Sequence, residues 1–150
     1  MEFGWIKIFG IAIVVLIMIP NIIYAIISGN EERAEEKVPI YLSICEQIGR
    51  YGCIVLIWMP LFVWKFGFRR EEDFAVYLCL NILLILLYYI IWFLYFKKRT
   101  LIKGLALAII PTMIFLISGI LLHHWSLVAA AFLFGVGHIS ITYITHQENN

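Results

Sequence analysis

Charged side chains are scarce in this 150-residue chain, where Asp, Glu, Lys and Arg make up only 14% of the residues. Soluble globular domains carry about 25% charged residues and roughly 45–50% apolar ones. Hydrophobic residues reach 63% here, so the composition excludes an ordinary soluble domain and predicts an integral membrane protein. Because each membrane-spanning helix needs about 20 apolar residues, five spans would take up roughly 100 residues and leave no room for a separate soluble domain.

An excess of basic charge is also missing. The 11 Lys and Arg residues are balanced by 10 Asp and Glu residues, which gives a formal net charge of +1. Proteins that bind nucleic acids concentrate Lys and Arg in a basic patch or stripe, and this sequence contains none. We therefore predict no nucleic acid partner.

Motifs for metal, haem or catalytic sites are absent as well. Cys45, Cys53 and Cys79 have no CxxC or zinc-ligand spacing, and we interpret them as buried thiols that act as small apolar groups. His124 and His138 lie at opposite ends of an antiparallel turn and span, so they cannot hold one haem ring. A nucleophile needs a base beside it, and the spacing of Cys53 and His138 does not support that pairing. We predict no metal and no cofactor, and an enzyme is the least favoured hypothesis.

Long apolar runs dominate what the sequence does contain. Lipid offers no partner for backbone N–H and C=O groups, so the spanning segments must be helices or a closed barrel. The alternation over about ten residues that barrel strands need is not visible. The first apolar run is longer than the roughly 7–15 residues of a secretory signal, so we expect it to be a permanent helix. The predicted fold is an all-α integral membrane protein, a single bundle of five transmembrane helices at about 4–28, 39–65, 74–96, 102–122 and 126–145.

Basic residues are distributed unevenly between the two sides of this bundle. Five spans place the N-terminus and the connections 65–73 and 123–125 on one side, and the C-terminus on the other. The first side carries four Lys and Arg residues (positions 7, 65, 69 and 70), and the second carries the remaining seven of the 11. The positive-inside rule then predicts a multi-pass protein of the cell membrane, in contact with the lipid bilayer, with its N-terminus outside and its C-terminus in the cytoplasm.

Polar side chains recur on one face of each span at the three- and four-residue spacing of a helix. Such polar faces, with their small residues, form the contacts between membrane helices. Glu46 and Arg50 stand four positions apart with the acid first, which is the favourable order for a helical ion pair. The candidate ligand-binding residues on these faces are Asn21, Tyr24, Glu46, Arg50, Asn81, Tyr88 and His138.

Depth in the membrane groups most of these candidates. At a rise of about 1.5 Å per residue, five of them lie within about 7 Å of the midpoints of their spans and in the half of the bilayer that faces the C-terminus. These five are Asn21, Tyr24, Arg50, Tyr88 and His138, whereas Asn81 falls in the other half. We further predict that the first and fifth spans are adjacent and close a ring, which would bring Asn21 and His138 into one site.

Each candidate also has a purely structural explanation. Arg50 could extend to the lipid headgroups with Glu46 as its exposed partner. His138 could be a neutral imidazole bonded to a neighbouring helix, and Asn21 and Asn81 could serve only to join helices. An arginine inside the membrane costs about 3 kcal/mol or more unless it is paired, snorkelled or hydrated. Because Gly49, Cys53 and Pro60 share its side of the helix, we predict that Arg50 points into the bundle, with snorkelling as the alternative.

Three prolines fall inside predicted spans, at positions 20, 60 and 111. A proline inside a helix frees a backbone carbonyl and kinks the helix, and kinked helices open space between them. Asn21 directly follows Pro20 and could use the freed backbone, which makes this pair a better site candidate than either residue alone. A kink that only improves packing remains the alternative.

Four stretches resemble a group of small bacterial polytopic membrane proteins to which no activity is assigned. They are 19–26 (IPNIIYAI), 46–52 (EQIGRYG), 109–119 (IIPTMIFLISG) and 137–143 (GHISITY). The resemblance extends over nearly the whole chain and implies a bacterial membrane location. It implies no catalytic residue.

Two functional hypotheses follow from the polar faces. In the first, a polar cavity in the inner half of the bilayer binds or passes a small molecule, a lipid or an ion, and would be lined by Asn21, Arg50, Tyr88 and His138. In the second, the protein is a structural or regulatory subunit that packs against another copy or another membrane protein. An exposed stripe of Gly and Ala on the fourth or fifth span would favour the second hypothesis.

Overall fold

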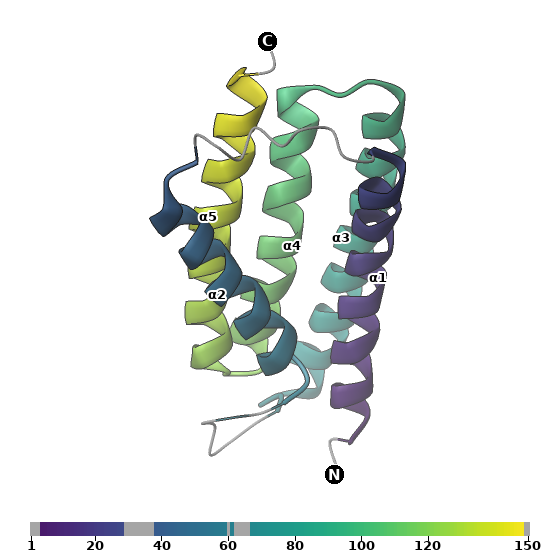
Figure 1. The fold of residues 1–150 in the computed structure, drawn as a ribbon. Helices are drawn as coiled ribbons and strands as arrows, with labels where there is room; N and C mark the ends of the chain where they lie inside the picture. Colours follow the sequence, from purple (N-terminus) through teal and green to yellow (C-terminus); the bar gives the residue numbers. More distant parts are fainter. Residues whose placement is uncertain (1–3, 29–37, 60, 62–66, 149–150) are drawn as a thin grey trace.

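The computed structural model describes residues 4–28, 38–59, 61 and 67–148, and this part of the chain is entirely helical apart from turns and connections. Its helices are α1 (Gly4–Ser28), α2 (Ile40–Leu56), α3 (Glu71–Lys97), α4 (Leu101–Leu121) and α5 (Trp125–Glu148). They follow one another in alternating directions along the bundle (Figure 1). The predicted all-α fold is confirmed for the described residues.

Four of these helices are long and apolar enough to cross a membrane. They are α1 over Ile8–Ser28, α3 and α4 over their full lengths, and α5 over Trp125–Gln147. The lipid-facing sides of the helices carry many exposed large hydrophobic side chains, such as Ile26 on α1 and Phe132 on α5. Long apolar helices with apolar outer surfaces are those of a multi-span membrane protein.

Helix α2 differs from the predicted second span. The prediction covers residues 39–65, but the helix ends at Leu56 and the next residues form a turn. Pro60 in the sequence explains an early end. The residue before a proline avoids helical backbone, and a proline has no N–H with which to donate a hydrogen bond to a helical carbonyl. Pro60 and most of the remaining predicted span lie outside the described residues.

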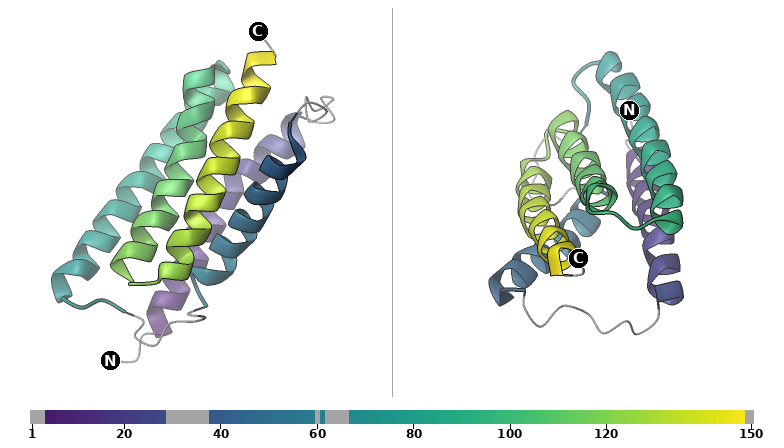
Figure 2. Two further views of the ribbon diagram at one scale, coloured as in Figure 1. Left: turned by 90° about the vertical axis from the view of Figure 1, so that its left-hand side faces the viewer. Right: turned by 90° about the horizontal axis from the view of Figure 1, so that it is seen from above.

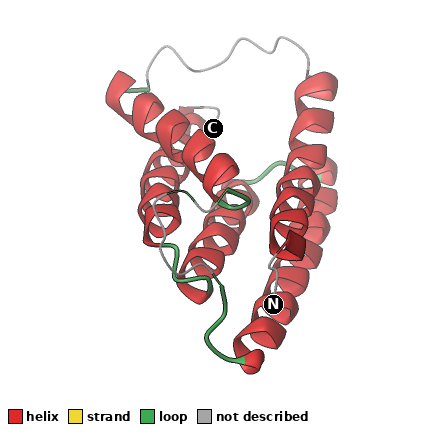
Figure 3. Ribbon diagram, turned by 90° about the horizontal axis from the view of Figure 1, so that it is seen from below, coloured by secondary structure: helices red, strands yellow, loops and turns green. Residues whose placement is uncertain are grey.

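The neighbours of each helix are a second difference from the prediction. Helix α5 packs against both α2 and α4, α4 packs against α3, and α3 packs against α1. The prediction that the first and fifth spans are adjacent is therefore wrong. Seen along the bundle axis, α1 and α2 lie at the two ends of this row of helices (Figures 2 and 3).

Aromatic and polar contacts explain why α1 packs on α3. The ring centroid of Tyr24 lies 5.4 Å from that of Trp92 and 5.9 Å from that of Tyr95. The hydroxyl of Tyr89 donates a hydrogen bond of 2.8 Å to the carbonyl oxygen of Leu16. That carbonyl is the one left without its helical donor by Pro20, so α3 supplies the hydrogen bond that α1 cannot make for itself.

The α2–α5 contact is unusually close, and glycine makes it possible. A Cβ atom added to Gly49 would lie 2.2 Å from the backbone nitrogen of Phe134. A Cβ atom added to Gly137 would lie 2.7 Å from the backbone nitrogen of Glu46. Each glycine therefore receives the backbone of the opposite helix, as small residues do in membrane helix pairs.

The sequence predicts a turn over 123–125 between the fourth and fifth spans, and the structure places it one residue earlier, over Leu122, His123 and His124. The His124 N–H donates to the Gly119 carbonyl at 2.8 Å, and the His123 N–H donates to the Ile120 carbonyl at 3.1 Å. This is the Schellman pattern, which needs a residue with positive φ just after the helix. His123 fills that position with φ of 54°, although glycine is the residue that adopts this conformation without steric cost.

The cysteines are distributed differently from the prediction. Cys53 is buried and Cys45 is partly buried, but Cys79 is exposed on the surface of the bundle. The interpretation of all three as buried thiols is therefore correct only in part. A thiol is a small, weakly polar group, so a position facing lipid costs little.

Candidate ligand-binding cavity

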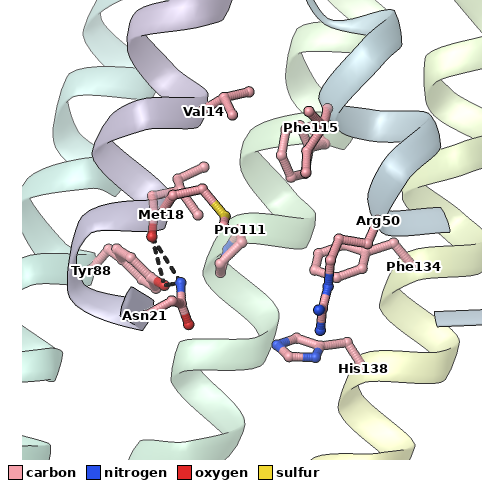
Figure 4. A pocket seen from close by; sticks show the side chains of 11 residues that line it. Val14, Met18, Asn21, Arg50, Tyr88, Pro111, Phe115, Phe134 and His138 are labelled. Atoms are coloured by element: carbon pink, nitrogen blue, oxygen red, sulfur yellow. Dashed lines mark hydrogen bonds between the residues drawn. The ribbon is translucent and has the colours of Figure 1, made fainter. Parts of the chain in front are cut away.

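A cavity of about 120 Å³ lies between the helices, and all five helices contribute to its walls. Figure 4 shows Asn21 and Tyr88 on one side of it and Arg50, Phe134 and His138 on the other. Most of its lining is apolar. The lining residues are Val14, Ile17, Met18, Asn21, Arg50, Ile54, Tyr88, Pro111, Phe115, Phe134 and His138.

The wall formed by α1 and α3 contains hydrogen bonds made by the side-chain N–H groups of Asn21 and the hydroxyl of Tyr88. The side-chain amide of Asn21 donates to the carbonyl oxygen of Ile17 at 2.8 Å and to the hydroxyl oxygen of Tyr88 at 2.7 Å. The Tyr88 hydroxyl in turn lies 3.5 Å from the same Ile17 oxygen. Asn21 thus uses a carbonyl next to the one freed by Pro20, and the freed carbonyl itself is satisfied by Tyr89. Of the two alternatives for Asn21, the structure therefore does not show its side chain on the freed carbonyl.

The opposite wall, formed by α2 and α5, carries a cluster of three ionisable groups. Arg50 donates from Nη2 to Oε1 of Glu46, and Nδ1 of His138 lies 3.3 Å from the same carboxylate oxygen. The carboxylate is only 4% exposed, whereas the side chains of Arg50 and His138 are 39% and 28% exposed. Glu46 therefore lies behind the other two, which face the cavity.

The buried carboxylate determines how the other two groups are arranged. An ionised carboxylate only accepts hydrogen bonds, so it favours the histidine form with its proton on Nδ1. The His138 ring is also stacked on the Phe134 ring, with centroids 4.9 Å apart and planes at 16°. These two contacts fix the imidazole, and they leave its Nε2 edge for other partners.

The structure brings together some, but not all, of the predicted site residues. Asn21, Arg50, Tyr88 and His138 line the cavity, and Glu46 supports it from behind. Tyr24 lies outside the cavity, in the aromatic cluster between α1 and α3, with the Arg99 guanidinium 5.2 Å from its ring centroid.

Asn81 belongs to a separate buried polar group. Its amide donates to the carbonyl oxygen of Tyr77 at 2.8 Å, and its side-chain oxygen lies 3.4 Å from the hydroxyl of Ser118. It does not line the cavity. Asn81 therefore joins α3 to α4, which is the structural explanation offered for it.

Sequence reasoning missed part of the apolar lining. Ile54 lies one helical turn after Arg50, Phe134 lies one turn before His138, and Met18 lies one turn after Val14. Residues three or four positions apart share a helix face. The spacing from Arg50, His138 and Asn21 could therefore have predicted these apolar residues as part of the lining. The polar pattern alone did not mark them, because apolar residues occur on every face of a membrane helix.

Metal-ligating side chains do not gather at this cavity. Among the described residues, no group of three or more His, Cys, Asp and Glu side chains is arranged to hold a metal ion. The ionisable groups present there instead form an ion pair with an attached imidazole. The chemistry that they offer is hydrogen bonding and charge.

Comparison with protein-family models, with curated proteins and with solved structures finds no match to this chain. The composition and the helices establish an all-α, multi-span membrane protein. The resemblance of the four sequence stretches to small bacterial membrane proteins stays a prediction. A specific function can be inferred only from the cavity and its side chains.

Proposed function

We propose that this protein binds a small molecule within the membrane, in the cavity lined by Asn21, Arg50, Tyr88 and His138, and that this binding serves passage of the molecule across the bilayer. The observation that carries the proposal is the position of Arg50 on the cavity wall. An arginine below the membrane interface is costly, and such residues usually mark a binding site or pathway. Arg50 is stabilised by Glu46 yet still reaches the cavity, so the bundle keeps a cation available inside.

The five-span arrangement is part of this proposal. Helix α2 has 17 residues, which at about 1.5 Å per residue extends roughly 25 Å and approaches the thickness of the hydrocarbon core. The alternating directions of α1 to α5 support a crossing by α2 as well (Figure 1). The cavity would then lie in the inner half of a bacterial cell membrane, with the N-terminus outside and the C-terminus in the cytoplasm.

Cysteine labelling tests this orientation. Lys98 and Trp125 are exposed near opposite ends of the bundle, so Lys98→Cys and Trp125→Cys form a matched pair, each made in a chain without its native cysteines. An impermeant maleimide applied to intact cells should label Trp125→Cys and not Lys98→Cys. Labelling of Lys98→Cys alone would mean that the orientation is reversed.

The alternative function, a subunit that packs against another membrane protein, has less support. A free stripe of Gly and Ala on α4 or α5 would favour it, but the glycines of these helices are buried inside the bundle and the exposed Ala129 does not extend into a stripe. Gly119 faces Val128, Gly135 faces Thr112 and Gly137 faces Glu46. The close contacts that small residues permit are therefore used within this chain.

Filling the cavity tests the proposed function. Ile54 lines the cavity, and its neighbour Val55 is exposed on the outer side of α2. Protein extracted in a mild uncharged detergent should retain a bound small-molecule mass in native mass spectrometry for the wild type and for Val55→Trp. The Ile54→Trp protein should have lost that mass. Retention of the same mass by Ile54→Trp, or no bound mass in any of the three, would contradict the proposal.

A further inference from the structure

The polar wall of the cavity presents the hydrogen-bond donors of Arg50, and the carboxylate of Glu46 that pairs with Arg50 is hidden. Arg50 and His138 line the cavity, whereas the Glu46 carboxylate lies behind them and is nearly fully buried. A guanidinium has five N–H donors in a planar fork and no acceptor. Glu46 is bonded to Nη2 alone among them, so the rest of the fork remains for a ligand. A ligand with an acceptor group, and above all an anion, complements this wall.

On the other wall, the hydrogen-bond donors are already bonded within the protein. The amide of Asn21 and the hydroxyl of Tyr88 bond to each other and to the Ile17 carbonyl. The rest of the lining consists of aliphatic and aromatic side chains together with Pro111. A ligand that fits these surroundings has one anionic end and an apolar remainder.

The cavity reaches the outside of the bundle between α1 and α2. Met18 on α1 and Arg50 on α2 line the cavity and are themselves 36% and 39% exposed. The two helices are in contact further down, where a Cβ atom on Gly10 would lie 2.6 Å from the Ile57 carbonyl oxygen. Helix α1 otherwise packs on α3, and α2 packs on α5, so α1 and α2 diverge from this contact toward the cavity.

The size of the cavity limits how much of a ligand it encloses. A cavity of about 150 Å³ holds a benzene ring, and this one is about 120 Å³. A carboxylate or phosphate with its first few carbon atoms fits within such a volume. A longer hydrocarbon chain must leave the cavity, and the exit between α1 and α2 leads to the apolar outer surface of the bundle.

We propose, on the basis of the proposed function, that the ligand is a single-chain anionic amphiphile. Its carboxylate or phosphate head is held by the guanidinium of Arg50, and its hydrocarbon tail leaves between α1 and α2. Recognition combines charge-assisted hydrogen bonds at the head with burial of the first carbon atoms against the apolar lining.

The test is direct binding to the purified full chain in an uncharged detergent. The probes are radiolabelled dodecanoate and dodecyl phosphate, with dodecanol, dodecyltrimethylammonium and inorganic phosphate as competitors. We expect both anionic probes to bind, dodecanol and the cation to compete at least about tenfold more weakly, and inorganic phosphate to compete hardly at all.

Variants separate the head contact from the fold. The double variant Glu46→Gln with Arg50→Gln removes both charges without leaving one unpaired, and should weaken dodecanoate binding at least about tenfold. Arg69 is exposed outside the cavity, so Arg69→Gln should leave binding unchanged. If the double variant does not fold, Arg50→Lys keeps the charge but loses the planar fork, and should still weaken binding.

The outcomes distinguish this inference from the proposed function. Equal affinity for dodecanol and dodecanoate would overturn the anionic class while leaving a cavity that binds small molecules. Equal competition by inorganic phosphate would mean that the ligand is a free anion and not an amphiphile. Unchanged binding in both the double variant and Arg50→Lys would overturn the role of Arg50. Failure of every probe, together with no retained mass in the wild type, would overturn both the inference and the proposed function.

Discussion

The close crossing of α2 and α5 holds Glu46 next to His138, and it depends on Gly49. A Cβ atom on Gly49 would lie 2.2 Å from the backbone nitrogen and 2.5 Å from the Cα atom of Phe134. Backbone atoms cannot move aside as a flexible side chain can, so Gly49→Ala should push the two helices apart.

A second glycine on the same helix provides the control. A Cβ atom on Gly52 would meet the Cβ atom of Ala130 at 3.1 Å, a contact that a shift of a few tenths of an ångström relieves. Both substitutions gain about the same helix propensity, close to 1 kcal/mol relative to glycine, so this gain cancels between them. The remaining difference is the overpacking cost of Gly49→Ala, about 1–3 kcal/mol.

Thermal unfolding in detergent measures this difference. For a chain of this length, 1 kcal/mol corresponds to about 2–4 °C in Tm, so Gly49→Ala should melt several degrees below Gly52→Ala. Gly49→Ala should also retain less ligand, because separation of the helices moves Glu46 away from His138. Equal melting temperatures for the two variants, or a more stable Gly49→Ala, would refute the inferred close contact.

Three further predictions concern charge, the turn and pH. Arg50→Leu should destabilise the protein by up to about 3 kcal/mol, because it leaves the Glu46 carboxylate buried without its counter-charge, and adding Glu46→Gln should restore most of the loss. His123→Gly should raise Tm, because it removes the strain of about 1–2 kcal/mol that an L-residue bears at a φ of 54°. Burial lowers the pKa of His124 below its ordinary value of 6.5, against the opposing effect of its hydrogen bond to the Leu61 carbonyl. The unfolded chain then binds the proton more readily than the native one, so stability should fall as the pH drops below about 6.5.

Each of these has its own control in melting experiments. Replacement of the exposed Arg69 by Leu should leave Tm nearly unchanged. If Arg50→Leu is as stable as this control, Arg50 does not stabilise the buried Glu46 carboxylate. A lower Tm for His123→Gly would contradict the Schellman geometry of the turn. The loss of stability in acid should be smaller in His124→Gln than in the wild type. If the two proteins lose stability identically as the pH falls, His124 is not the group responsible.

The sequence by itself determined that the chain is a helical membrane protein, and it predicted which polar groups share one level of the bundle. Hydropathy is a local property, and lipid forces a spanning segment to satisfy its own backbone as a helix. The fixed rise per residue then converts sequence position into depth. Asn21, Arg50, Tyr88 and His138 could therefore be predicted at one level, and in the structure they line one cavity.

Only the tertiary structure decided which helix lies beside which. The sequence placed α1 next to α5, but α1 packs on α3, where Tyr89 satisfies the carbonyl freed by Pro20. It also gave no sign that Glu46 would bind His138 as well as Arg50. Lipid is as apolar as the helix surfaces, so hydrophobicity does not choose neighbours in a membrane. The choice depends on how glycines, aromatic rings and polar groups far apart in the chain fit together, and that fit exists only in the assembled bundle.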